Sequence, residues 1–190
     1  MKETLKNLVK AYIGESQARN RYTFYAKVAQ KEGFEQIAEI FLATAEQEKT
    51  HAKRLFEFIN EIKESNDEIT IEVTMPNIYG DTKENLKAAI AGETYETETM
   101  YPKFAQIAED EGYQNIANHL RAIAIAEKNH QERYKSLLDN IENDTVFKKK
   151  ADTWWVCREC GYIHFGSEAP KECPSCNHPQ SFYQVRQLEY

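Results

Sequence analysis

Apolar residues recur at alternating intervals of three and four along four long segments of this chain, a spacing typical of amphipathic helices. The segments cover residues of about 3–31, 34–63, 82–110 and 114–143. Gly33 and Gly112 interrupt the pattern within the first and the second pair of segments, where a helix is expected to end. Because each of these connections is short, each pair is predicted to form an antiparallel helical hairpin.

The segment between the hairpins, residues 64–80, has no helical periodicity. A helix of about 28 residues is about 42 Å long, and an extended linker of about 17 residues can run beside its whole length. The linker is therefore predicted to be a crossover that returns the chain to the end at which the first helix begins. Asp81 or Thr82 is expected to cap the third helix.

The two hairpins form an internal repeat, in which the Gly-Glu pair at 14–15 matches the pair at 92–93. Glu15 lies 18 residues before the glycine that ends its helix, but Glu93 lies 19 residues before the matching glycine. A helix that keeps its buried face commonly absorbs one extra residue as a π-bulge. A π-bulge or kink is therefore predicted between Glu93 and Pro102, where proline also removes a backbone donor.

Six ionisable residues occupy the centres of the four apolar stripes, where an unpaired charge is costly to bury. They are Glu15, Glu48, His51, Glu93, Glu127 and His130. Surface charges or internal salt bridges are the alternative interpretation, but the stripes contain no matching basic residues. One Glu from each of two helices, with Glu-x-x-His from each of the other two, is the ligand set of carboxylate-bridged di-iron and di-manganese bundles.

Glu96 makes the predicted metal box unequal. It lies one turn after Glu93, whereas Ala18 occupies the matching position after Glu15. The alternative is that Glu96 is an exposed helix glutamate like Glu98. Four tyrosines also fall near the box: Tyr22, Tyr25, Tyr95 and Tyr101. Their rings either only fill the core, or their hydroxyls bond to a ligand carboxylate or serve as a local hydrogen source.

Composition and charge narrow the classes of protein that fit. The chain has 190 residues, 41% of them hydrophobic, with only 7 Gly and 5 Pro, as expected for one helix-rich domain with a small appendage. A net charge of −7 argues against nucleic acid as a partner. The sequence has no apolar run long enough to cross a bilayer and no signal-peptide core at its start, so no membrane association and a cytoplasmic location are expected.

All four cysteines lie near the end of the chain, as two Cys-x-x-Cys pairs formed by Cys157 with Cys160 and by Cys173 with Cys176. This spacing predicts one tetrahedral Cys₄ metal site. Spacing alone does not separate zinc from iron. A segment of about 40 residues buries too little core to fold alone, so the metal is expected to supply folding free energy. Residues 144–153, with their lysine run, are predicted to be a mobile linker.

These motifs together resemble those of a rubrerythrin over nearly the full chain. The resemblance implies an all-α, ferritin-like four-helix bundle with one long crossover (1–146), followed by a rubredoxin-like domain (147–190). It also implies two non-haem irons, bound by the six box residues and Glu96, and one iron at the four cysteines. In this family one iron exchanges a His ligand for a Glu ligand on oxidation, which in this sequence corresponds to His51 and Glu96.

The function that the resemblance implies is a peroxidase for oxidative-stress defence. Hydrogen peroxide is the expected substrate, and a rubredoxin or an NAD(P)H-dependent reductase is the expected electron donor. Glu96, His51, Tyr22 and Tyr101 are the predicted catalytic residues. A homodimer is expected, with the Cys₄ iron of one subunit near the di-iron site of the other and domain swapping open. The alternative functions are a ferritin-type iron oxidation and handling protein, and a binding module with structural zinc in both sites.

Overall fold

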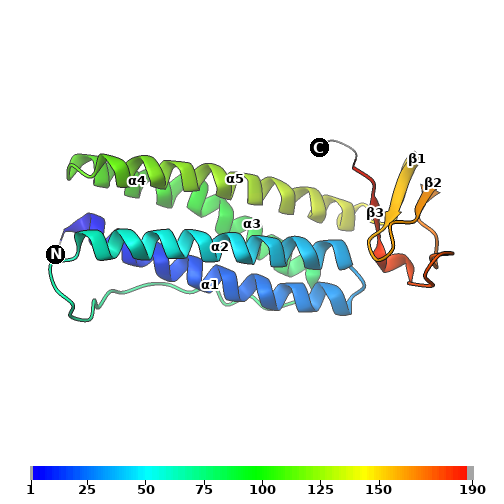
Figure 1. Cartoon of the computed structure of the whole chain (residues 1–190), viewed down its shortest axis with the longest axis horizontal. Helices are drawn as coiled ribbons and strands as arrows, with labels where there is room; N and C mark the ends of the chain where they lie inside the picture. Colours follow the sequence, from blue (N-terminus) through cyan, green and yellow to red (C-terminus); the bar gives the residue numbers. More distant parts are fainter. Residues whose placement is uncertain (1, 188–190) are drawn as a thin grey trace.

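The helical part of the protein is a bundle of two antiparallel hairpins. The structure is a computed structural model that describes residues 2–187. Residue 1 and residues 188–190, at the outer ends of the two predicted domains, lie outside the described range. Figure 1 shows the hairpins side by side along the long axis of the molecule. The helical elements are α1 (Glu3–Lys31), α2 (Glu35–Ile62), α3 (Thr82–Tyr95), the π-helix η1 (Glu96–Met100), α4 (Tyr101–Asp110) and α5 (Gln114–Glu142).

The crossover between the hairpins runs along the length of the bundle (Figure 1). It ends at Asp81, which caps α3 in a capping box with Glu84. The prediction that the crossover returns the chain to the end at which α1 begins was wrong. The crossover leads to the end at which α1 finishes. The physical reason is that α2, being antiparallel to α1, already brings the chain back to the start of α1, so a crossover can only lead away from it.

Two glutamates that match in the repeat each cap a helix of the other hairpin. Glu111 accepts hydrogen bonds from the backbone amides of Glu3 and Thr4 at the start of α1, both at 3.0 Å. Glu32 accepts one from the amide of Thr82 at the start of α3, also at 3.0 Å. Each glutamate directly precedes a glycine of positive φ that ends its own helix. Carboxylates are favoured at helix N-termini, so these contacts fasten the two hairpins together.

The predicted π-bulge is confirmed as η1, which joins α3 to α4. Its five residues hold the extra position of the second hairpin, so that Glu93 before it and Tyr101 after it are both buried. An unbroken α-helix would turn one of these two side chains away from the core, because one residue advances a helix by about 100°.

The apolar core of the bundle is divided into two clusters. One contains Leu8, Leu55, Phe58, Tyr101 and Leu120, and the other contains Tyr22, Tyr25, Phe41, Leu86 and Tyr134. Along each helix the predicted metal ligands fall between a member of one cluster and a member of the other. The box of carboxylates and imidazoles therefore lies in mid-bundle, closed off by apolar layers on both sides.

The C-terminal part contains a three-stranded antiparallel sheet of order β2-β1-β3. Its strands are β1 (Lys148–Cys157), β2 (Ile163–Glu168) and β3 (Tyr183–Val185), with a short 3₁₀-helix, Gln180–Phe182, before β3. The prediction of a mobile linker over 144–153 was wrong from Lys148 onward, where β1 begins and pairs with Glu168. The lysine run forms a strand because β2 offers it a hydrogen-bonding edge, which local sequence does not reveal.

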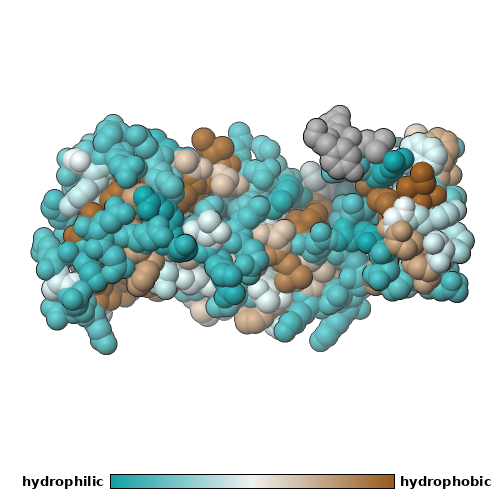
Figure 2. All heavy atoms as spheres, viewed as in Figure 1, coloured by the Kyte–Doolittle hydropathy of each residue, from teal (hydrophilic) through white to brown (hydrophobic). Residues whose placement is uncertain are grey.

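The sheet lies past the end of the bundle at which α2 begins (Figure 1). Phe147 stacks on Phe34 with ring centroids 6.4 Å apart, and Arg158 contacts Glu39 on α2. Figure 2 shows hydrophilic colours over much of the visible face, with hydrophobic patches both over the helices and at the sheet end. Among the described residues, the structure has no helix with the length and apolar character that crossing a membrane requires.

Candidate metal centres

Six of the predicted ligands meet in mid-bundle as two adjoining groups. One group contains Glu15, Glu48, His51 and Glu127, and the other contains Glu48, Glu93, Glu127 and His130. Within each group, one ligand atom from every residue lies within 4.8 Å of the others. The two groups share Glu48 and Glu127, so the arrangement suits two ions side by side.

The shared carboxylates point one oxygen into each group. Glu127 places Oε1 2.9 Å from Nδ1 of His51 and Oε2 2.7 Å from Nδ1 of His130. Glu48 places Oε2 3.1 Å from His51 and Oε1 3.1 Å from His130. Bridging carboxylates of this kind hold two cations close and screen their repulsion. The geometry therefore makes Glu48 and Glu127 the candidate bridges.

Several of these atoms are close to one another and yet form no hydrogen bond. Both oxygens of Glu127, Oε1 of Glu48, Oε2 of Glu93 and Nδ1 of His130 are buried without a hydrogen-bond partner among the described residues. Orphaned buried polar atoms are rare in proteins. Atoms that converge on a common point without bonding each other fit a shared cation, so the donor set fits two iron ions.

The charges in the box are mutually dependent. Burial, followed by repulsion from Glu127 and Glu48, holds the pKa of Glu15 well above its usual range. Burial also raises the pKa of Glu93, to about 8. Burial acts to raise the pKa of Glu48 as well, but the imidazoles of His130 and His51 outweigh it and lower this pKa to about 2. Several carboxylates in one apolar layer therefore need added positive charge, which two divalent ions supply.

Glu96 lies beside this box but belongs to neither group of ligand atoms. Only 9% of Glu96 is exposed, so the alternative interpretation of an exposed helix glutamate was wrong. Glu98, two residues later, is exposed. Burial and the charges of Glu93 and Glu127 hold the pKa of Glu96 well above the usual range. As a ligand, Glu96 stays a prediction.

Two of the four tyrosines contact the box through their hydroxyls. Tyr22 donates to Oε1 of Glu93 at 2.6 Å, and Tyr101 donates to Oε1 of Glu15. These contacts match in the repeat, since each tyrosine bonds the ligand glutamate of the other hairpin. Tyr25 is buried but donates to the carbonyl of Ile78 at 2.7 Å, and Tyr95 is exposed.

The sequence did not single out two further residues near the box. Tyr134 is fully buried and its hydroxyl has no partner, and the charge of Glu93 contributes to raising its pKa after burial. Its place on the α5 stripe suggested packing alone. Arg21 has a buried Nη1 atom without a partner. The sequence signal that could have identified Arg21 is its position seven residues after Gly14, which places both residues on one face of the helix.

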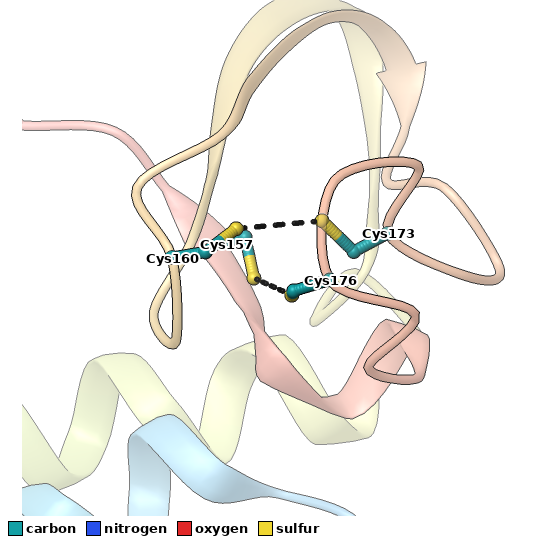
Figure 3. A group of neighbouring side chains, drawn as sticks. All are labelled: Cys157, Cys160, Cys173 and Cys176. Carbon is teal, nitrogen blue, oxygen red and sulfur yellow. Dashed lines mark hydrogen bonds between the residues drawn. The ribbon is translucent and has the colours of Figure 1, made fainter.

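The four cysteines converge at the sheet end of the molecule (Figure 3). The Sγ atoms of Cys157 and Cys176 are 3.7 Å apart, as are those of Cys160 and Cys173. Four sulfurs placed tetrahedrally at about 2.3 Å from one metal are about 3.8 Å apart. The cysteines are free thiols, and their spacing fits a metal ion and excludes disulfides, whose sulfurs lie about 2 Å apart.

Two family models match the chain, one over each part. The Rubrerythrin model matches residues 6–138, and the model for the rubredoxin-like domain of rubrerythrin matches residues 155–184. A putative rubrerythrin of Methanocaldococcus jannaschii is 57% identical, covering 100% of this chain and 96% of that protein. Rubrerythrin-1 of Clostridium acetobutylicum is 49% identical, covering 99% and 96%.

Solved structures agree with these matches. Nigerythrin in a fully reduced, all-ferrous state has a TM-score of 0.66 and 34% identity, covering 98% of this chain and 88% of that one. Symerythrin from Cyanophora paradoxa, at 22% identity and a TM-score of 0.59, shares the fold. The ferritin-like bundle, the rubredoxin-like domain and the candidate di-iron and Cys₄ sites are thus those of one family. The chain belongs to the rubrerythrin family of di-iron proteins.

Proposed function

We propose that this protein is a cytoplasmic peroxidase that reduces hydrogen peroxide to water in oxidative-stress defence. Its two-electron reaction joins one peroxide, two electrons and two protons to give two waters. The observation that supports it most directly is the unequal box, in which buried Glu96 stands outside two otherwise matching groups of ligands. A site that only holds metal does not require this inequality.

The seven ligand residues are proposed to hold two irons, which when bound would each supply one electron to the oxygen–oxygen bond. His51 is the less enclosed of the two imidazoles, with 16% of its side chain exposed against 3% for His130. His51 and Glu96 would be alternative ligands of one iron, since neutral imidazole suits its ferrous form and an anionic oxygen suits the harder ferric form.

The tyrosines are proposed to handle protons at the box. The hydroxyl of Tyr22 is hydrogen-bonded to Glu93 and that of Tyr101 to Glu15. Each holds a proton beside a ligand carboxylate, in a layer that lies between two apolar clusters. Such a hydroxyl can donate to oxygen as the peroxide bond breaks and be restored through the carboxylate.

Electrons are proposed to enter at the Cys₄ site from a rubredoxin or an NAD(P)H-dependent reductase. We further propose a homodimer, in which the Cys₄ site of one subunit serves the box of its partner. The division into domains at residues 146 and 147 stays a prediction; the last helix ends at Glu142 and the first strand begins at Lys148.

The test is anaerobic peroxide consumption by the iron-loaded protein, with NADH, a rubredoxin and its reductase. Glu96→Ala is expected to lower turnover about 10²-fold, because a missing or misplaced ligand group costs about that much. Glu98→Ala, which removes an exposed glutamate of the same π-helix, is the matched control and is expected to turn over normally.

Two outcomes would contradict the proposal. Iron-loaded protein that consumes no peroxide with any donor is not a peroxidase. Rapid oxidation of added ferrous iron into a large assembly with a mineral core would favour the ferritin-type alternative. An optical spectrum taken before and after one equivalent of peroxide separates iron from zinc, since zinc gives no ferric-thiolate absorption.

A further inference from the structure

A cavity of about 480 Å³ opens beside the box, between the crossover and helices α1 and α3. Glu96 and Met100 of the π-helix line it, and Glu72–Pro76 of the crossover lie over it. Hydrogen peroxide needs the room of about two waters, on the order of 60 Å³. The cavity therefore has room for several times what that substrate requires.

Two helix glycines keep this space free. Gly14 and Gly92 directly precede Glu15 and Glu93, and both line the cavity. A Cβ at either position would meet no heavy atom within 4 Å, and neither residue has a positive φ. Glycine inside a helix is destabilising by about 1 kcal/mol relative to alanine. Neither packing nor backbone conformation calls for it here, so its remaining consequence is the free volume.

The lining of the cavity is polar at Glu96 and apolar over much of the rest. Arg21 also lines the cavity. Its charge acts to lower the pKa of Glu96, against burial and the neighbouring carboxylates, which raise it. Its unpartnered Nη1 is a free donor for an oxygen atom. The apolar part of the lining consists of Ile13, Val73, Pro76, Met100 and Phe104.

We propose that this cavity binds organic hydroperoxides, with the hydroperoxyl group at Glu96 and Arg21 and the apolar substituent against the crossover. This extends the proposed function to a second substrate class and rests on it. The reaction balances as ROOH plus two electrons and two protons giving ROH and water. The electrons come from the same rubredoxin or NAD(P)H-dependent reductase as for hydrogen peroxide.

The first experiment measures binding without turnover. Iron-loaded protein, kept reduced and anaerobic, is dialysed to equilibrium against 2-phenyl-2-propanol, the alcohol that cumene hydroperoxide would yield. We expect saturable binding to the natural protein and at least about tenfold weaker binding to Gly92→Leu and to Gly14→Leu, whose side chains project into the cavity from two different helices. Ala91→Leu, an exposed neighbour on α3, is the matched control and is expected to bind normally.

The second experiment compares turnover of cumene hydroperoxide with that of hydrogen peroxide. Both Leu variants are expected to lose at least about tenfold more kcat/KM with the bulky substrate than with the small one. If the natural protein reduces hydrogen peroxide but neither binds the alcohol nor reduces cumene hydroperoxide, the cavity has no such role. If it binds the alcohol but reduces no peroxide at all, the proposed function fails while the binding site stands.

Discussion

At the scale of single residues, the box differs from an ordinary core in how its polar side chains are partnered. Glu15 and Glu93 each accept a hydrogen bond from a tyrosine of the other hairpin. A hydrogen bond from a phenol to a charged carboxylate is stronger than one between neutral groups. The ring of each tyrosine also belongs to an apolar cluster. These side chains therefore join the metal box to the core that encloses it.

The hydroxyl of Tyr22 can be removed without disturbing the ring. Tyr22→Phe is expected to keep both irons and to lower peroxide turnover about 10²-fold, the usual effect of losing a positioned proton donor. Iron content and stopped-flow peroxide reduction check this. Tyr25→Phe is the matched control, since Tyr25 lies on the same helix but donates to the carbonyl of Ile78. Equal rates in the two variants would show that the Tyr22 hydroxyl is structural.

The interhelical cap at Glu111 predicts a pH dependence of stability. Hydrogen bonds from Thr4 and from the amide of Glu3 lower the pKa of Glu111 below its usual value. A depressed pKa means that the charged carboxylate stabilises the fold above the unfolded glutamate pKa of about 4.3, and that this contribution is lost as pH falls through the folded value. Glu111→Gln keeps an acceptor oxygen but loses the charge, and is expected to be about 0.5 kcal/mol less stable at pH 7.

This difference should shrink as pH falls through the folded pKa of Glu111, because protonation removes the charge of the natural side chain. Thermal unfolding of the two proteins at pH 7 and at a pH low enough to protonate Glu111 measures it, and their difference at each pH cancels the effect of acid on the metal sites. A difference that is the same at both pH values would mean that charge at Glu111 does not matter.

At the scale of elements, the helices could be predicted closely, whereas the sheet could not. The predicted helix bounds agree with the structure within one or two residues, because the apolar periodicity of a helix depends only on its own residues. The π-helix follows from counting one extra residue between Glu93 and Tyr101. The start of β1 depends on β2, which lies later in the chain. The cavity likewise depends on where the crossover lies against α1, a contact between segments distant in sequence.

The π-helix itself can be tested by deleting Glu98, an exposed residue within it. The deletion should yield one continuous α-helix over α3 and α4, with Glu93 and Tyr101 still facing the core. Helical content and iron binding are expected to be retained, but turnover should fall about 10²-fold, because a shift of about 1 Å in Glu96 is enough for that. Circular dichroism, iron analysis and peroxide kinetics check it.

The control for this deletion is Glu98→Ala, which removes the same side chain and keeps the register. A deletion variant that turns over as fast as this control would show that the π-helix is not needed to place Glu96.

At the scale of the whole molecule, the two metal centres of one chain lie apart. Arg158, next to Cys157, contacts α2 at Glu39, nine residues or about 14 Å along the helix from Glu48, and the sheet lies beyond the helix end (Figure 1). Electron transfer slows steeply with distance. In the proposed homodimer, two antiparallel chains offset along their long axes could bring the sheet end of each beside the middle of the other.

Mixing two inactive variants tests this arrangement. Glu127→Ala should inactivate the box and leave the Cys₄ site, whereas Cys173→Ser should do the reverse. If electrons pass between subunits, unfolding and refolding the variants together should restore about a quarter of natural turnover, because half of randomly formed twofold dimers are mixed and each has one working pair. Recovery is measured against each variant refolded alone. No recovery, in dimers shown by mass spectrometry to be mixed, would mean that each chain reduces its own box.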